Sequence, residues 1–346
     1  METVRWGMIG CGKVTEIKSG PGFYKAENSQ LVAVTARNRD KAVDYARRHG
    51  VAQVYERAAD LIQAPEVDAV YVATPPSSHL EFGLMVAAAG KPCLMEKPMA
   101  MNYAECVRMN DAFCSACVPL FVAYYRRALP RFLKVRQLLK GGAIGTVTAV
   151  QVTVSDRLAA LSMSGGERAK RWRFDPAIAG AGLFLDLGSH CIDLLDFLLG
   201  RITRVCGYAV NTGHAYMAED VTAACFEFES TAVGVGIWNF NADHAGDGIL
   251  FTGSEATLYT PVFTDGDIVL RKKGAEETFV FRNPPHVHQP LIQSVVDHLL
   301  GRGQCESTGD SGARASWAMD QCIATFYSAV GARLGSGTFD TGGVCP

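Results

Sequence analysis

Short apolar runs alternate with longer helix-like segments over the first third of the chain. Strands are expected at the apolar runs Val4–Ile9, Leu31–Ala36, Ala69–Ala73, Pro92–Met95 and Leu120–Ala123. Helices are expected at the segments rich in Ala, Glu, Arg and Met between them, namely Asp40–His49, Leu80–Ala89 and Tyr103–Ala116. Gly50 and Gly90 follow two of these segments and are typical helix stops. Strands that alternate with helices predict a doubly wound parallel sheet.

The pattern changes after about Tyr124. Most of the later runs have no helix between them, so we expect a mainly antiparallel sheet there. Its strands are expected at Thr146–Val154, Ile202–Val210, Val221–Phe228, Ala232–Trp238, Gly248–Phe251, Ala256–Tyr259, Ile268–Arg271 and Glu277–Phe281. Helices are expected at Arg131–Lys140, Asp186–Leu199, Leu291–Leu300 and Ala313–Val330. The sequence therefore predicts a nucleotide-binding domain over residues 1–123 and an α+β domain over residues 124–346.

Composition supports a folded protein with a small ligand. The chain has 346 residues, and domains of roughly 100–200 residues agree with two of them. Apolar residues make up 48% and charged residues 20%, so the composition gives no reason to expect disorder. Because 33 Lys and Arg face 35 Asp and Glu, no net field attracts nucleic acid or an anionic membrane.

The chain starts with METVRWGMIGCG, which lacks the basic and long apolar segments of a secretory signal. The most apolar stretch, Leu183–Leu199, contains four residues that a bilayer core penalises: Asp186, His190, Asp193 and Asp196. The 11 cysteines are odd in number and follow no repeating framework, which favours reduced thiols. We therefore expect a cytoplasmic protein without a membrane span.

Two glycines, Gly10 and Gly12, follow the first expected strand. In this context glycine lets the backbone approach a pyrophosphate at the start of a helix. The third small position of the dinucleotide fingerprint is Thr15, so only part of the fingerprint is present. A plain strand-to-helix turn is the alternative that these glycines alone leave open.

The second expected strand ends at Ala36-Arg37-Asn38, where an acidic residue would bind the adenosine ribose of NAD. Arg37 instead suits the 2′-phosphate of NADP, because a guanidinium binds phosphate through charge-assisted hydrogen bonds. The alternative is that Arg37 stacks on adenine or faces solvent. We expect NADP to be the preferred cofactor and NAD to be the second choice.

Further motifs follow in a fixed order. They are ATPPSSH at Ala73–His79, MEKP at Met95–Pro98, YRRALP at Tyr125–Pro130, WR at Trp172–Arg173 and GAGLFLDLGSHCID at Gly180–Asp193. In this order and over nearly the whole chain, they resemble the glucose-fructose oxidoreductase/inositol dehydrogenase-like family. Ala181 departs from that family's pattern because it replaces the middle of three glycines.

The resemblance implies a Rossmann domain followed by an α+β domain with a large open sheet. It also implies that Glu96 and Lys97 lie beside the nicotinamide and that the Lys97–Pro98 peptide is cis. The cofactor-binding residues that it implies are Gly10, Gly12, Lys13, Val14, Arg37, Thr74, Pro75, His79, Glu96 and Lys97. Substrate contacts are expected from Tyr125 and Arg173.

The expected catalytic residues are Lys97, Asp186 and His190. Asp186 and His190 are four positions apart, so a helix that begins at Asp186 would place both side chains on one face. An imidazole has an ordinary pKa near 6.5 and can accept a hydroxyl proton near neutral pH, while a carboxylate orients the ring. The alternative is that Asp186 caps a helix and His190 is a satisfied core residue.

We therefore expect reversible hydride transfer between NAD(P) and a hydroxyl or carbonyl carbon of a sugar, polyol or related cyclic alcohol. Two other functions stay open. The first is glycoside cleavage by oxidation and elimination with a bound NAD. The second is a regulatory protein that senses the cofactor without catalysis. Substrate choice is expected to depend on the loops Ser155–Lys170 and Asn241–Asp247.

No metal site is expected. Cys114 and Cys117 form a CxxC without the second pair that a zinc site needs, so their function stays open. His286 and His288 have no evident third ligand, and we expect them to be solvated loop residues. An open sheet leaves one face in need of cover, which predicts a homodimer or homotetramer.

Overall fold

The computed structural model describes residues 2–157 and 172–329. By contacts the chain divides into two compact units. Among the described residues, the first unit contains those up to Ala128 together with Pro284–Ala313, and the second contains Leu129–Asn283 together with residues 314–329. Residues 284–313 therefore pack with the first unit, although they follow the second in the chain. The assignment of cofactor and substrate to residues 1–123 and 124–346 stays a prediction.

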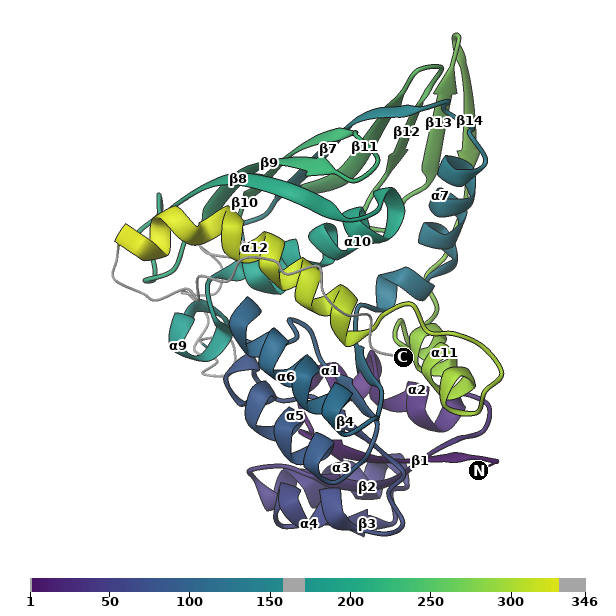
Figure 1. The fold of residues 1–346 in the computed structure, drawn as a ribbon, viewed down its shortest axis with the longest axis vertical. Helices are drawn as coiled ribbons and strands as arrows, with labels where there is room; N and C mark the ends of the chain where they lie inside the picture. The colour runs from purple at the N-terminus through teal and green to yellow at the C-terminus, as the bar shows by residue number, and fades with distance from the viewer. Residues whose placement is uncertain (1, 158–171, 330–346) are drawn as a thin grey trace. The chain divides into compact units, whose positions relative to one another are not determined.

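The first unit contains a sheet of six parallel strands (Figure 1). The strands are β1 Val4–Ile9, β2 Ser29–Thr35, β3 Gln53–Val54, β4 Ala69–Val72, β5 Cys93–Met95 and β6 Leu120–Val122. Their spatial order is β3-β2-β1-β4-β5-β6, which is the Rossmann order with the switch point between β1 and β4. The predicted doubly wound parallel sheet is confirmed.

Helices connect these strands. In the first unit they are α1 Lys13–Ile17, α2 Gly20–Lys25, α3 Arg39–His49, α4 Ala58–Gln63, η1 Pro76–Ser78, α5 His79–Ala88, α6 Tyr103–Ser115, η2 Tyr125–Ala128 and α11 Gln289–Leu299. Asn38 caps α3 by accepting from the Lys41 N–H at 3.0 Å. Gly50 ends α3 with φ of 69°, so the predicted stop is confirmed. All four residues of β4 are buried, as its continuous apolar run predicts.

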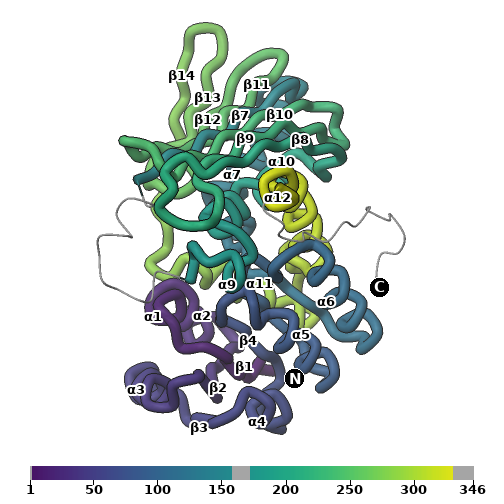
Figure 2. The backbone as a smooth tube through the Cα atoms, turned by 90° about the vertical axis from the view of Figure 1, so that its left-hand side faces the viewer, coloured from purple at the N-terminus to yellow at the C-terminus, as the bar shows by residue number. Residues whose placement is uncertain are grey.

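The second unit contains an eight-stranded sheet in the order β14-β13-β12-β11-β7-β10-β9-β8 (Figures 1 and 2). The strands are β7 Val147–Ser155, β8 Ile202–Val210, β9 Val221–Phe228, β10 Val233–Asn239, β11 Gly246–Gly253, β12 Thr257–Thr260, β13 Ile268–Lys272 and β14 Ala275–Phe279. β7 and β10 run parallel, and every other neighbouring pair of these strands is antiparallel. The predicted, mainly antiparallel sheet is confirmed.

One face of this sheet is covered and the other is open. The helices of the second unit are α7 Pro130–Lys140, α9 Pro176–Ala179, the π-helical turn η4 Phe184–Gly188, α10 Ser189–Leu199 and most of α12 Gly309–Ala329. A Cβ on Gly207 of β8 would lie 2.3 Å from the Cα atom of Cys322, so α12 packs directly on that strand. On β10 the alternate residues Val233, Val235 and Ile237 are 44–54% exposed.

The structure bears on two expectations about the chain as a whole, namely those for its most apolar stretch and for its cysteines. Among the described residues, Pro176–Leu199 is long and apolar enough to cross a membrane, but 78% of its apolar window is buried inside the structure. Of the ten cysteines in the described ranges, nine are thiols, as expected, whereas the expectation of reduced thiols is wrong for Cys114. Cys114 is disulfide-bonded, and because Cys117 is free, these two do not pair with each other.

Candidate active site

The glycine turn after β1 leaves no room for a side chain at its first position. Gly10 has φ of 104°, and a Cβ there would lie 2.6 Å from the carbonyl oxygen of Ala73. Gly12 precedes α1, and a Cβ there would meet nothing within 4 Å. The backbone at the start of α1 is therefore uncovered, which fits a dinucleotide pyrophosphate. Thr15 takes the third small position without strain, because its hydroxyl donates to the Gly12 carbonyl at 2.8 Å.

The end of β2 carries an accessible positive charge. Arg37 is the second residue after β2 and is exposed. It forms no ion pair with another described residue, whereas the nearby Arg39 pairs with Glu56 at 3.2 Å. A guanidinium in this position is available to a phosphate group.

His79 is buried and connects two segments of the first unit, so its ring offers no exposed surface to a ligand. Its ring is 1% exposed, with Nε2 2.8 Å from the Thr74 carbonyl and Nδ1 3.0 Å from the Pro98 carbonyl. Burial lowers the pKa of His79, although its backbone hydrogen bonds oppose that effect. This ring joins the loop Thr74–Pro75 to the cis peptide Lys97–Pro98, which is present as predicted.

Glu96 is the centre of a buried network. Its Oε1 accepts from the Tyr71 hydroxyl at 2.5 Å, and its Oε2 accepts from the Lys97 backbone N–H at 3.1 Å. The Tyr71 hydroxyl also lies 3.0 Å from the Ser19 Oγ. This network holds the backbone at Lys97, so a role for Glu96 in positioning Lys97 follows directly from its contacts.

The prediction that His288 is a solvated loop residue is wrong. His288 is 2% exposed, and its ring stacks on Tyr125 with centroids 4.4 Å apart. Its Nδ1 lies 3.5 Å from the Glu96 Oε1. Burial is the main reason that the pKa of His288 lies well below its ordinary value, and nearby Lys18, Lys97 and Arg126 add to the effect. A neutral imidazole therefore lies beside the predicted substrate residue Tyr125.

Asp186 lies in the π-helical turn η4, not at the start of a regular helix as predicted. Its Oδ2 accepts from the Nε of Arg173 at 3.0 Å. The Arg173 guanidinium also lies 4.3 Å from the ring of Trp172. Arg173 was predicted to contact substrate, and the structure places it on the Asp186 carboxylate. π-Helical turns are frequent at functional sites, which agrees with the importance expected of Asp186.

His190 is in the first turn of α10 and is 4% exposed. Its ring meets the ring of Phe263 edge to face, with centroids 6.0 Å apart. The Asp247 carboxylate accepts from the Phe263 N–H at 2.6 Å, and buried Arg131 donates to the Thr264 carbonyl at 3.0 Å. Asp247 and Arg131 therefore fix the turn that presents Phe263 to His190. Neither residue was predicted to have this role.

The predicted residues fall into two groups. The first unit brings together the Gly10 turn, Thr74, His79, Glu96 and Lys97 through the contacts above, and also contains Tyr125. The second unit contains Asp186 with Arg173, and His190. Most of the loop Ser155–Lys170, which was expected to choose the substrate, lies outside the described residues. Within the described ranges, no group of three or more metal-ligating side chains is present.

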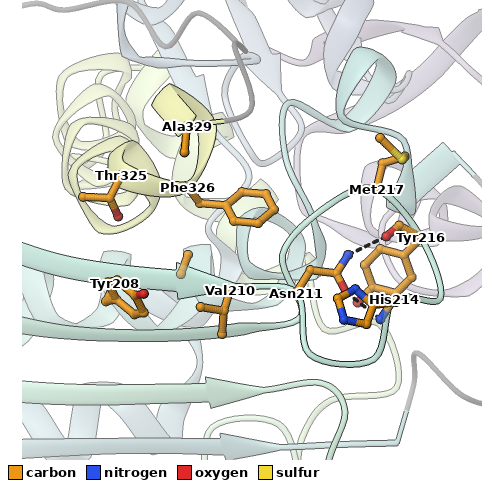
Figure 3. A pocket seen from close by; sticks show the side chains of 10 residues that line it. Tyr208, Val210, Asn211, His214, Tyr216, Met217, Thr325, Phe326 and Ala329 are labelled. Carbon is orange, nitrogen blue, oxygen red and sulfur yellow. Dashed lines mark hydrogen bonds between the residues drawn. The ribbon is translucent and has the colours of Figure 1, made fainter.

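A further hollow lies in the second unit. It has a volume of about 630 Å³ and is lined by β8, the loop after β8 and α12 (Figure 3). In that loop Asn211 donates through its Nδ2 to the Tyr216 carbonyl at 2.5 Å. The described residues that line this hollow include none of the predicted site residues.

Comparison with known proteins identifies both parts of the chain. Residues 4–124 match the family described as an oxidoreductase family with an NAD-binding Rossmann fold. Residues 132–259 match the GFO/IDH/MocA C-terminal domain.

Similar proteins match nearly the whole chain. Oxidoreductase P35 of Formosa agariphila is 36% identical, covering 92% of this chain and 97% of that protein. Trans-1,2-dihydrobenzene-1,2-diol dehydrogenase of Danio rerio is 29% identical, and the match covers 83% of this chain and 82% of that protein. The solved structure of levoglucosan dehydrogenase with NADH and levoglucosan has a TM-score of 0.81 at 20% identity, and the match covers 94% of this chain and 98% of the chain in that structure.

Proposed function

Because the chain belongs to the GFO/IDH/MocA oxidoreductase family, we propose that it transfers a hydride between NAD(P) and a hydroxyl-bearing carbon of a sugar, polyol or related cyclic alcohol. The observation that carries this proposal is the Asp186 carboxylate, bound by Arg173 at 3.0 Å and followed four residues later by buried His190. The similar proteins above include a dihydrodiol dehydrogenase and a levoglucosan dehydrogenase, which supports a cyclic alcohol as the substrate class.

The cofactor would be held by the uncovered backbone at Gly10 and Gly12, by Lys13 and Val14, and by the loop Thr74–Pro75. His79 and Glu96 contribute by holding that loop and the Lys97 backbone in place. When bound, the nicotinamide accepts or donates the hydride. NADP is the preferred form in this proposal. Arg37 is exposed after β2 and forms no ion pair with another described residue, so its guanidinium is available to the 2′-phosphate of NADP.

The protein's own residues handle the proton and the substrate oxygen. During oxidation His190 takes the hydroxyl proton through a ring nitrogen, and Asp186 orients the groups around it. Lys97, in the first unit, is the third proposed catalytic residue, and its ammonium would stabilise negative charge that develops on the substrate. Arg173 holds Asp186, and Tyr125 contacts the substrate. Reduction uses the same roles in reverse.

Three further parts of the proposal concern the whole protein. Residues 1–123 bind the cofactor, and residues 124–346 bind the substrate and form a homo-oligomer. The apolar row Val233, Val235 and Ile237 on the open sheet face supports this assembly, because an exposed apolar strand face needs cover. The proposed location is the cytoplasm.

The test is an absorbance screen for reduced nicotinamide, with NADP and NAD in turn and a library of sugars, polyols and aldehydes. We expect turnover with a cyclic alcohol. Lys97→Ala, Asp186→Ala and His190→Ala should still bind NADPH but lose turnover, with proton transfer alone accounting for a factor of about 100 to 10,000. Glu276→Gln, on the exposed strand β14, is the matched control and should keep full activity.

Two results would overturn the proposal. Near-normal turnover in His190→Ala, with an unchanged pH profile, would remove His190 from the mechanism. Aglycone release from a glycoside without net change in the cofactor would identify oxidation-elimination instead of dehydrogenation.

A further inference from the structure

The carboxyl group of Glu219 is buried in the second unit, and none of the roles assigned above uses it. It is 1% exposed and precedes β9. Its two oxygens accept from the Gly182 backbone N–H at 3.0 and 3.1 Å, and the Tyr327 hydroxyl of α12 donates to Oε2 at 2.6 Å. A Cβ on Gly182 would lie 2.5 Å from the Glu219 carbonyl oxygen, so this position needs a glycine.

Gly182 starts the segment that carries the proposed catalytic residues. Its carbonyl accepts from the Leu185 N–H at 3.2 Å, in the first turn of that segment. Asp186 follows in η4, and His190 follows in α10. A carboxylate on an N–H at the start of a helical segment fixes that end by charge and by hydrogen bonding.

We propose that Glu219, clamped by Tyr327, is a positioning residue that holds Asp186 and His190 in their working geometry through the Gly182 N–H. This inference rests on the proposed function for the roles of Asp186 and His190. Glu219 acts in its ionised form, because an ionised carboxylate is acceptor-only on both oxygens, whereas protonation turns one oxygen into an O–H donor. Protonation would remove part of this acceptor capacity and release the start of the segment.

Three ionisable groups face Glu219. Tyr327 lies on α12 and Tyr216 on the loop before Glu219, and burial raises the pKa of both phenols. The adjacent Asp220 carboxylate accepts from Thr212 and Gly213 backbone N–H groups, each at 2.7 Å. Burial raises the pKa of Glu219 to about 7, against the opposing hydrogen bonds of Tyr327 and Gly182. Glu219 therefore loses its charge as the pH falls through neutrality.

Two variants separate this role from simple structural support. Glu219→Gln is permanently neutral, so kcat at pH 8 should fall by up to about 100-fold, as for a misplaced catalytic group, with little change in KM. In the parent protein kcat should decline toward acidic pH, and we call this decline the acidic limb. In Glu219→Gln the part of this limb that comes from protonation of Glu219 should disappear. Tyr327→Phe removes a bond to the ionised form, so the pKa of Glu219 rises and the limb should move to higher pH.

Hydrogen exchange gives a readout that needs no substrate. Loss of the Gly182 bond with Glu219 still buried is a local opening that protonation favours. We therefore expect protection of backbone N–H groups in residues 180–190 against local opening, corrected for intrinsic exchange, to fall between pH 8 and pH 6 in the parent protein. In Glu219→Gln this pH dependence should be absent, and in Tyr327→Phe it should shift to higher pH. Glu276→Gln, an exposed residue paired with Arg271 at 2.8 Å, is the control and should behave as the parent.

The outcomes distinguish this proposal from the proposed function. If no substrate is found, exchange alone decides whether Glu219 holds the segment. Identical exchange in the parent and in Glu219→Gln at every pH would overturn the inference. An unchanged acidic limb of kcat in Glu219→Gln, in an enzyme that turns over and binds NADPH normally, would overturn it too.

Discussion

Glu219 should make the folded protein less stable as the pH rises. Burial raises the pKa of this carboxyl from its ordinary value of 4.5 to about 7. Its stabilising effect is therefore fully present below pH 4.5 and is lost as the pH rises through about 7. The difference between the two pKa values corresponds to about 3 kcal/mol of unfolding free energy.

Glu219→Gln isolates this effect, because the amide does not titrate. The assay is denaturant unfolding at several pH values between 4.5 and 8, at one fixed protein concentration. The unfolding free energy of the variant, minus that of the parent, should increase by about 3 kcal/mol across this range. Any difference between the hydrogen bonds of the amide and those of the neutral acid adds an offset that does not depend on pH. Taking the difference removes the titration of every other group, which is common to both proteins.

A difference that stays constant from pH 4.5 to pH 8 would refute this reasoning, because Glu219 would then have the same pKa in the folded and unfolded chains. A difference that decreases with pH would mean that the hydrogen bonds from Gly182 and Tyr327 outweigh burial. Glu276→Gln provides the control, since that exposed carboxylate pairs with Arg271 and is not buried.

Three other outcomes are expected. Arg37→Ala should weaken the binding of NADPH by about 1.5–3 kcal/mol more than the binding of NADH in titration calorimetry, and an equal loss of binding free energy for both cofactors would contradict a phosphate contact. Gly10→Ala should lower stability by about 1–3 kcal/mol in thermal unfolding, because of the φ of 104° and the approach to Ala73; an unchanged midpoint would contradict the strain. Val235→Glu should lower the mass measured by light scattering, whereas a parent protein that is monomeric at micromolar concentration would reject the oligomer.

The strands were predictable because burial leaves a local pattern. β4 is buried on both faces and is a continuous apolar run, whereas β9 alternates between buried and exposed residues. β3 escaped prediction because its two residues, Gln53 and Val54, are too few to form a pattern. The turn η4 escaped because the π-helical geometry at Asp186 has no signature in residue spacing.

Side-chain partners from distant segments were less predictable. His288 follows two prolines and was taken for a loop residue, yet Tyr125 and Glu96 enclose it. The contact of Arg173 with substrate, expected from its motif, stays a prediction, and its hydrogen bond to the Asp186 carboxylate was not predicted. In both cases the local sequence gives the residue type, and the tertiary fold decides what that residue contacts.

The two buried glutamates use the same arrangement in separate units. Glu96 accepts from the Tyr71 hydroxyl and from the Lys97 N–H, and Glu219 accepts from the Tyr327 hydroxyl and the Gly182 N–H. A buried carboxylate is costly unless donors satisfy it, so each arrangement persists only while its tyrosine and its backbone N–H stay in place. Each therefore fixes the backbone at or before a proposed catalytic residue. The motif Met95–Pro98 contains Glu96, but no local spacing pairs Glu96 with Tyr71 or Glu219 with Tyr327, because these tyrosines come from other strands and helices.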